Sequence, residues 1–159
     1  MTLSIATLLS PDQVLLDIDA SGKLDAINSV ISVLSDNADV VDMDRLTKDI
    51  VEREYVMSTG VGYGLALPHA KSQGVSATVA ALGITNKPIE FNSIDGEPVR
   101  LIFLLAGPAS ESSKHIRILS RVSRLMSRET FRRKLLECEG VPDVLRVFES
   151  AENLLLKTQ

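Results

Sequence analysis

Tryptophan is absent from the 159-residue sequence, and only two tyrosines and one cysteine, Cys138, occur in it. A single cysteine cannot form an internal disulfide, which is typical of proteins in a reducing compartment. So few aromatic rings leave little surface on which bases or sugars could stack. Apolar runs stay far below the ~20 residues that span a bilayer, and the N-terminus lacks a signal-peptide pattern. We therefore expect a cytoplasmic protein.

An excess of positive charge is also missing. The formal net charge is −4 and the isoelectric point is near 5.2, so no general electrostatic attraction to nucleic acid or to an anionic membrane exists. We expect no nucleic-acid partner and at most a peripheral association with a membrane transporter. Hydrophobic residues make up 45% of the chain and charged residues 24%, which is typical of a globular domain. The length predicts one domain.

The spacing of apolar residues predicts interleaved helices and strands, and therefore an α/β fold. Helices are expected over residues 23–35, 43–55, 129–137 and 142–150, and a further long helix is expected to begin at Ser112 or Ser113. Residues 154–159 are expected to fray. Strands are expected over residues 14–18, 75–85 and 99–106, with a short edge strand at 89–91. The uninterrupted apolar run at 99–106 is typical of a central strand covered on both faces. We predict a mixed β-sheet flanked by helices on both sides.

A glycine-rich stretch, STGVGYGLALPHAK at residues 58–71, leads directly into a histidine. Its glycines permit positive φ and a close approach of backbone to a ligand, while Pro68 stiffens the chain before His69. No Gly-Lys-Ser/Thr follows, so it is not a Walker A loop, and the glycine spacing fails the dinucleotide fingerprint. A tight turn without a ligand is the alternative. Because His69 is adjacent, we predict a phosphate-binding loop formed by Ser58, Thr59, Gly60, Gly62 and Gly64.

His69 and His115 are the two histidines of the chain. His69 follows the glycine-rich stretch, and His115 falls in the first turn of the helix after the central strand. Both are expected at one end of the sheet, where open α/β folds bind their ligands. The positive end of the helix dipole disfavours the imidazolium form of His115, so this ring is expected to be neutral. His69 alone could simply be a histidine held by backbone hydrogen bonds.

Arg53 ends an apolar helix stripe that contains Leu46 and Ile50, and a guanidinium there can fork onto two oxygens of a phosphate. Arg53, the loop amides and the two histidines together suit a phosphoryl group on a histidine nitrogen. The nucleophile would be a neutral imidazole, and the donors would stabilise the charged oxygens during transfer. A metal site that uses Glu52 or Glu54 with the histidines is an alternative, but no third His or further Cys is available. We expect no metal and no cofactor.

Two further features carry less chemistry. The basic cluster alternates with apolar positions and is interpreted as a solvated helix face that could also meet an acidic partner. Its members are Arg124, Arg128, Arg132, Arg133 and Lys134. Cys138 has no basic neighbour at a helix N-terminus, so a buried or half-buried inert thiol is expected.

Arg53-Glu54, the segment 58–69 and Lys114-His115 resemble the enzyme IIA domains of the mannitol/fructose class in the bacterial phosphoenolpyruvate-dependent sugar phosphotransferase system, including the nitrogen-related regulatory branch. Spacing agrees as well as residue type, with Arg53 sixteen residues before His69 and His115 forty-six after it. Ala70 departs from the glycine that the family often has there. The resemblance implies one IIA domain over residues 1–159, with its core at about 5–150, and a mixed sheet sandwiched by helices.

The resemblance also implies roles for the candidate residues. His69 would accept a phosphoryl group from the histidine-containing phosphocarrier protein, His115 would be the second active-centre histidine, and Arg53 would bind the phosphate. The phosphoryl group would pass to a IIB domain, or phosphorylation of His69 would switch the affinity for a regulatory target protein. No IIB or membrane-embedded IIC segment occurs in the sequence, so a free-standing IIA is expected.

Overall fold

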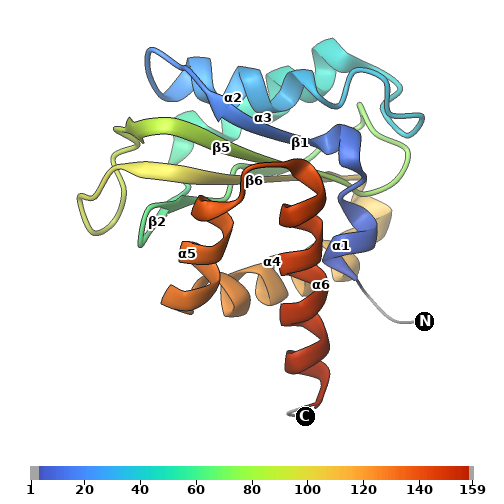
Figure 1. Ribbon diagram of the computed structural model, residues 1–159. Helices are drawn as coiled ribbons and strands as arrows, with labels where there is room; N and C mark the ends of the chain where they lie inside the picture. Colours follow the sequence, from blue (N-terminus) through green and yellow to red (C-terminus); the bar gives the residue numbers. More distant parts are fainter. Residues whose placement is uncertain (1–3, 158–159) are drawn as a thin grey trace.

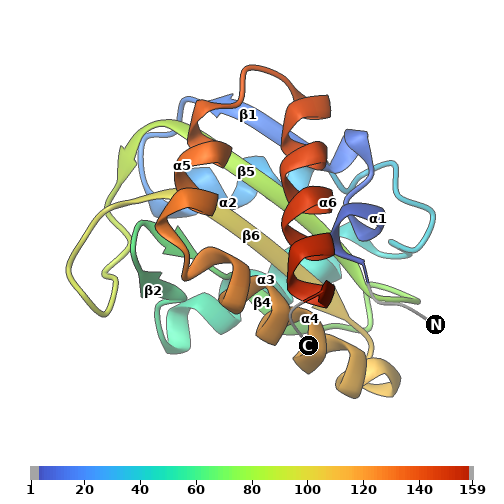
Figure 2. The same ribbon diagram turned by 60° about the horizontal axis from the view of Figure 1, so that its bottom comes forward.

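The computed structural model of the protein describes residues 4–157. They form three layers, with one sheet between two layers of helices (Figure 1). Helices cover both faces of the sheet, and a short N-terminal helix packs beside the last helix (Figures 1 and 2). In the described residues the helices are α1 (Ile5–Leu8), α2 (Lys23–Ser32), α3 (Met43–Val56), α4 (Ser112–Met126), α5 (Glu129–Glu137) and α6 (Val141–Lys157). Short 3₁₀ turns at Pro11–Gln13 and Ala109–Glu111 precede β1 and α4.

The sheet is mixed, as predicted. The strands of the described chain are β1 (Val14–Ile18), β2 (Gly60–Gly62), β3 (Leu65–Ala66), β4 (His69–Lys71), β5 (Val79–Ile89) and β6 (Val99–Gly107). Their order is β1-β5-β6-β3-β2, and β4 also pairs with β6. β6 is antiparallel to β5 and parallel to both β3 and β4, while β1 is parallel to β5. The predicted α/β class, with helices on both sides of a mixed sheet, is therefore confirmed.

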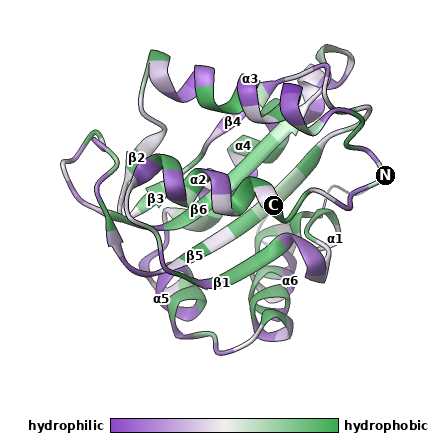
Figure 3. Cartoon of the chain, turned by 90° about the horizontal axis from the view of Figure 1, so that it is seen from above, coloured by the Kyte–Doolittle hydropathy of each residue, from purple (hydrophilic) through white to green (hydrophobic). Residues whose placement is uncertain are grey.

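The central strand β6 separates two apolar cores. Leu101, Phe103 and Leu105 face the layer that contains α4 and α6, whereas Ile102 and Leu104 face α2 and α3. Alternate side chains of a strand point to opposite faces, so a strand buried on both sides must be apolar throughout. Figure 3 shows this apolar colour along β1, β5 and β6, with polar and apolar residues alternating along α3.

Several element boundaries differ from the predictions. β5 begins at Val79 instead of residue 75 and continues to Ile89, so the separate edge strand at 89–91 does not form. Its pairing with β6 is irregular between Ile84 and Ile89, where Pro88 has no N–H to donate to the ladder. Three short strands, β2 to β4, occupy the stretch that the glycines had suggested to be a loop.

The helix ends also differ. α2 stops at Ser32 instead of continuing to residue 35, because the chain leaves the helix in successive turns. α6 extends to Lys157, well past the predicted end at residue 150 and into the part expected to fray. Tertiary contacts hold this extension: Leu155 is buried, and Glu152 binds the N-terminal helix α1. Within residues 4–157 no helix is long and apolar enough to cross a membrane.

Glu152 is a buried carboxylate, 5% exposed, that caps α1. It accepts hydrogen bonds from the backbone N–H groups of Ile5 at 2.8 Å and Ala6 at 3.0 Å, and it lies 3.3 Å from a guanidinium nitrogen of Arg121. Glu152→Gln removes the charge and turns an amide N–H₂ towards groups that are themselves donors. We expect the free energy of unfolding, measured by urea denaturation, to fall by about 2–3 kcal/mol.

Glu149→Gln is the matched control, because Glu149 lies one turn earlier on α6 and is exposed. Its free energy of unfolding should stay within about 0.5 kcal/mol of the wild-type value. Equal losses in the two variants would contradict the capping role of Glu152.

Candidate active site

His69 begins β4 and pairs with Leu105 on the central strand. Its Nδ1 atom lies 2.6 Å from the carbonyl oxygen of Leu67. A carbonyl oxygen can only accept a hydrogen bond, so Nδ1 carries a proton, and in the neutral tautomer that this bond selects the lone pair is on Nε2. The ring is partly exposed. Nε2 of His69 is therefore the ring nitrogen available as a nucleophile.

His115 lies beside it, in the first turn of α4, with the two ring centroids 5.8 Å apart. The residue is 4% exposed, and its Nδ1 atom is buried without a hydrogen-bond partner in the described chain. Burial lowers the pKa of His115 to about 4, with repulsion from Lys71 and from the protonated form of His69 as lesser causes. His115 is therefore neutral at neutral pH, as predicted. The main cause is burial of the ring, whereas the prediction rested on the helix dipole.

Gly107, at the end of β6, makes room for the second histidine. A Cβ atom at this position would lie 3.6 Å from Nδ1 of His115 and 2.9 Å from Oγ1 of Thr78. Thr78 in turn donates both its N–H, at 2.7 Å, and its hydroxyl, at 2.5 Å, to the carboxylate of Glu111 just before α4. These two bonds lower the pKa of Glu111 and tie the start of α4 to the start of β5.

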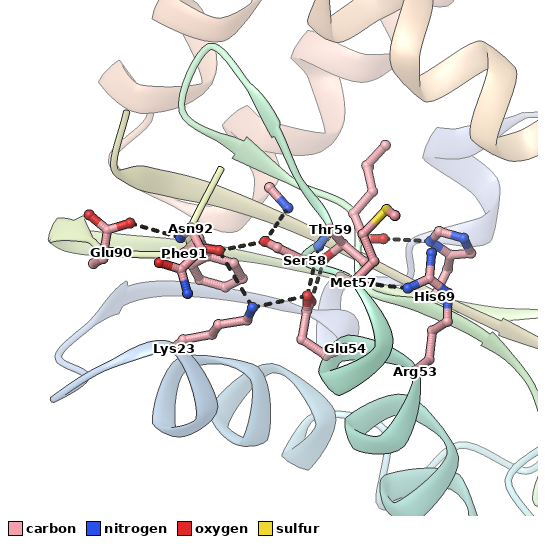
Figure 4. Close-up of polar contacts among 12 residues, drawn as sticks. Lys23, Arg53, Glu54, Met57, Ser58, Thr59, His69, Glu90, Phe91 and Asn92 are labelled. Atoms are coloured by element: carbon pink, nitrogen blue, oxygen red, sulfur yellow. Dashed lines mark hydrogen bonds and ion pairs between the residues drawn. The ribbon is translucent and has the colours of Figure 1, made fainter. Parts of the chain in front are cut away.

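Arg53 lies in the last turn of α3, where one guanidinium nitrogen donates to the carbonyl oxygen of Met57 at 3.0 Å. In Figure 4 its side chain extends from α3 towards His69. Arg53 makes no ion pair with any residue among 4–157. Its remaining N–H donors are therefore free to bind an anion. The structure thus brings together the three residues predicted to carry the chemistry.

The predicted phosphate-binding loop is divided by the structure. Gly62 and Gly64, with φ of 107° and 76°, form the turn between β2 and β3. Leu65, at that turn, pairs with Leu101 of β6, whereas His69 pairs with Leu105. Four residues along a strand correspond to about 13 Å, so these two glycines lie well away from the histidine ring.

Contacts with residues 93–98 explain the glycines instead. A Cβ atom at Gly60 would lie 2.4 Å from Oγ of Ser93, and one at Gly62 would lie 3.2 Å from the carboxylate of Asp95. Asp95 also accepts a hydrogen bond from the backbone of Tyr63 at 3.0 Å. Close packing and turn geometry therefore account for these positions.

Ser58 and Thr59 lie at the other end of the hairpin, on the side of His69. Thr59 accepts a hydrogen bond from Leu67 N at 3.0 Å, and Ser58 donates from its hydroxyl to the carbonyl oxygen of Phe91. Thr59 also donates to Glu54, a buried carboxylate that we had considered only as a metal ligand. The position of Glu54 directly after Arg53 was the available sequence signal for this role.

A metal site lacks a ligand set in the described chain. No three His, Cys, Asp or Glu side chains of residues 4–157 gather in a metal-binding arrangement. Glu54 is engaged by Thr59 and by Lys23, whose Nζ atom lies 3.2 Å away, and Glu52 is exposed beside Lys48.

One member of the predicted basic cluster, Arg132, contacts other parts of the protein. Arg132 does not project freely into solvent: it lies over the ring of Tyr63 at 4.8 Å and donates to the carbonyl oxygen of Met126 at 2.7 Å. The rest of the cluster is exposed.

Cys138 is half-buried, and burial raises the pKa of its thiol, in agreement with an unreactive cysteine.

The fold and the site define a mixed α/β domain that presents a pair of histidines and an arginine at one end of its central strand. Residues 7–151 match the family described as "Phosphoenolpyruvate-dependent sugar phosphotransferase system, EIIA 2". The chain therefore belongs to this family of phosphotransferase-system IIA components. The predicted resemblance is confirmed.

Known relatives agree with this assignment. The chain is 35% identical over 144 residues to the fructose-specific EIIA component of Haloferax volcanii, with 89% of this chain and 94% of the relative covered. It is 32% identical over 145 residues to the fructose-specific EIIABC component of Bacillus subtilis, where the match covers 91% of this chain but only 23% of the relative.

Solved structures show the same fold. The nitrogen regulatory protein IIA-Ntr from Neisseria meningitidis superimposes with a TM-score of 0.84 at 26% identity, covering 91% of this chain and 98% of that one. The Escherichia coli mannitol enzyme IIA in its complex with phosphorylated enzyme IIB has a TM-score of 0.73 at 19% identity, with 89% and 96% covered.

The lowered pKa of His115 makes stability depend on pH. The folded value is about 4 and the ordinary value is 6.5, so between these values the unfolded chain binds more protons than the folded one. The stability due to neutral His115 is therefore present above pH 6.5 and is lost as the pH falls towards 4. His115→Gln removes this titration. The loss of unfolding free energy between about pH 7.5 and about pH 4.5 should be smaller in the variant by roughly 2 kcal/mol.

Urea denaturation of both proteins at the two pH values measures this difference. The other titrating groups, Glu111 among them, are present in both proteins and cancel in the comparison. Identical pH dependence in the two proteins would show that His115 is not a neutral buried ring.

Proposed function

We propose that this protein is a phosphoryl carrier in which Nε2 of His69 accepts the phosphoryl group. The observation that carries the proposal is the hydrogen bond from Nδ1 of His69 to the carbonyl oxygen of Leu67, 2.6 Å long. This bond leaves the lone pair on Nε2 and stabilises the positive charge that develops on the ring during attack. As the bond from Nε2 to phosphorus forms, the bond between phosphorus and the donor's nitrogen breaks.

Arg53 and His115 would stabilise the transferred group. Arg53 can place two N–H donors on the phosphoryl oxygens, since its only bond in the described chain is to the carbonyl of Met57. His115 is neutral near neutral pH, so it places no positive charge beside the nucleophile. Because its Nδ1 atom is buried without a partner, we assign its proton to Nε2, where it can donate to the phosphoryl group.

Exposed apolar side chains near the site support a protein as the phosphoryl donor. Tyr55, Val56 and Met57 follow Arg53 along α3 and are 72%, 81% and 68% exposed, and Ile116, which follows His115, is 64% exposed. Such apolar surface beside a reactive group is typical of a protein-docking site. The donor that fits is the histidine phosphocarrier protein. By analogy with the mannitol IIA, whose solved complex contains phosphorylated IIB, a IIB domain is one acceptor.

A regulatory role is the second candidate, and the likeness to the nitrogen regulatory protein of Neisseria meningitidis favours it. In that case phosphorylation of His69 would change the affinity for a target protein and no sugar would be modified. The carrier role and the regulatory role use the same residues and differ in the partner protein that binds the phosphohistidine.

Incubation with phosphoenolpyruvate, enzyme I and the phosphocarrier tests the proposal. Intact-mass measurement should show the gain of one phosphoryl group that is labile in acid and stable in base. His69→Ala should abolish the gain, because it removes the nucleophile. His115→Ala should keep the gain but form it more slowly, since one donor to the phosphoryl oxygens is lost.

Labelling that survives His69→Ala would refute His69 as the acceptor. Nitrogen-15 NMR of the labelled protein should place phosphorus on Nε2, and phosphorus on Nδ1 would contradict the assigned tautomer. Binding of the phosphorylated and unphosphorylated forms to a IIB domain, compared with candidate regulatory targets, separates the two roles.

A further inference from the structure

Neighbouring residues at the end of α3 point in different directions. Arg53 extends towards His69, whereas Glu54 turns into the protein and is 4% exposed (Figure 4). A buried carboxylate costs several kcal/mol unless hydrogen bonds or an opposite charge compensate it. The burial of Glu54 therefore depends on its hydrogen-bond and ion-pair partners. The phosphoryl transfer described above assigns no role to this residue.

The hydrogen-bond donor to Glu54 is Thr59, which directly precedes β2. One carboxylate oxygen accepts from the backbone N–H of Thr59 at 2.7 Å, and the other accepts from the Thr59 hydroxyl at 2.5 Å. The carbonyl oxygen of Thr59 accepts from Leu67 N at 3.0 Å. The carbonyl oxygen of Leu67 lies 2.6 Å from Nδ1 of His69. A continuous series of hydrogen bonds thus runs from Glu54 to the ring of His69.

Lys23 holds the buried end of this series. Its ammonium nitrogen lies 3.2 Å from the Glu54 carboxylate and 3.4 Å from the carbonyl oxygen of Phe91. The same Phe91 carbonyl accepts the hydroxyl of Ser58, next to Thr59. Both oxygens of Glu54 are therefore engaged, and the segment 58–59 is held from α2, α3 and the loop after β5.

We propose that Glu54 is a positioning residue for phosphoryl transfer. By clamping Thr59 it fixes the backbone of Leu67, and the Leu67 carbonyl then holds the proton of His69 on Nδ1 and aims Nε2 at the phosphoryl donor. The proposal rests on His69 as the acceptor. Displacement of a nucleophile by about 1 Å can slow a reaction by about 10²-fold, so a clamp of this kind affects rate more than partner binding.

Glu54→Gln tests the proposal. The amide oxygen can accept only one of the two Thr59 donors well, the amide N–H₂ faces the other donor, and the charge that pairs with Lys23 is lost. We expect kcat for phosphoryl transfer from the phosphocarrier to fall at least about tenfold, with KM for the phosphocarrier unchanged within about twofold. Nitrogen-15 NMR of the unphosphorylated protein should show part of His69 with its proton on Nε2, whereas the wild type carries it on Nδ1.

Two variants serve as controls. Glu52→Gln makes the same chemical change two residues earlier on α3, where the side chain is 63% exposed, and should behave as the wild type in rate and in tautomer. Thr59→Val removes only the hydroxyl bond and keeps the ion pair with Lys23, so it should give a smaller change of the same kind. It tests the proposal independently if Glu54→Gln does not fold, as judged by circular dichroism.

Folded Glu54→Gln and Thr59→Val proteins that transfer at the wild-type rate with an unchanged His69 tautomer would overturn the proposal. An equal fall in rate for Glu52→Gln would do the same, because it would trace the effect to a general loss of charge. The tautomer measurement needs no phosphoryl donor. If the wild-type protein were never labelled, the proposed function would fail while the positioning of His69 by Glu54 could still be decided.

Discussion

The pairing of β6 with its neighbours is the constraint on which the site depends. β6 is buried on both faces and hydrogen-bonds to β5 on one side and to β3 and β4 on the other. Its pairing at Leu105 sets the position of His69, and its end at Gly107 leads through one short turn into the helix that carries His115. Two histidines distant in the sequence are thereby positioned by one buried strand, with their ring centroids 5.8 Å apart.

Near this strand, two carboxylate–threonine pairs organise the site. Glu54 binds Thr59 below His69, and Glu111 binds Thr78 beside His115, each carboxylate taking both the N–H and the hydroxyl of one threonine. Two buried side-chain atoms of the described chain have no hydrogen-bond partner: Nδ1 of His115 and Oγ of Ser93. Unsatisfied polar atoms are rare in folded proteins and are tolerated where function requires them. Nδ1 of His115 belongs to a ring that burial keeps neutral beside the nucleophile.

Much of the fold was predictable because local patterns determine local structure. The apolar run of β6 and the periodicity of α3 and α4 each led to the observed element. The errors arose where contacts distant in the sequence decide. α6 continues past residue 150 because Glu152 binds α1, and β5 continues through Pro88 because an irregular pairing with β6 accommodates that residue. No pattern confined to a few neighbouring residues contains those contacts.

The sequence by itself determined which residue types are available for chemistry: two histidines, an arginine before a glycine-rich stretch, and one cysteine. It also determined the α/β class, because apolar periodicity follows directly from which faces are buried. Only the tertiary structure decided which residues meet. The register of β3 and β4 on β6 leaves Ser58 and Thr59 near His69 and carries Gly62 and Gly64 to the far end of the hairpin. Register depends on pairing between distant segments, which no local pattern contains. The glycine-rich stretch predicted to bind a phosphate is, for the most part, a tightly packed turn.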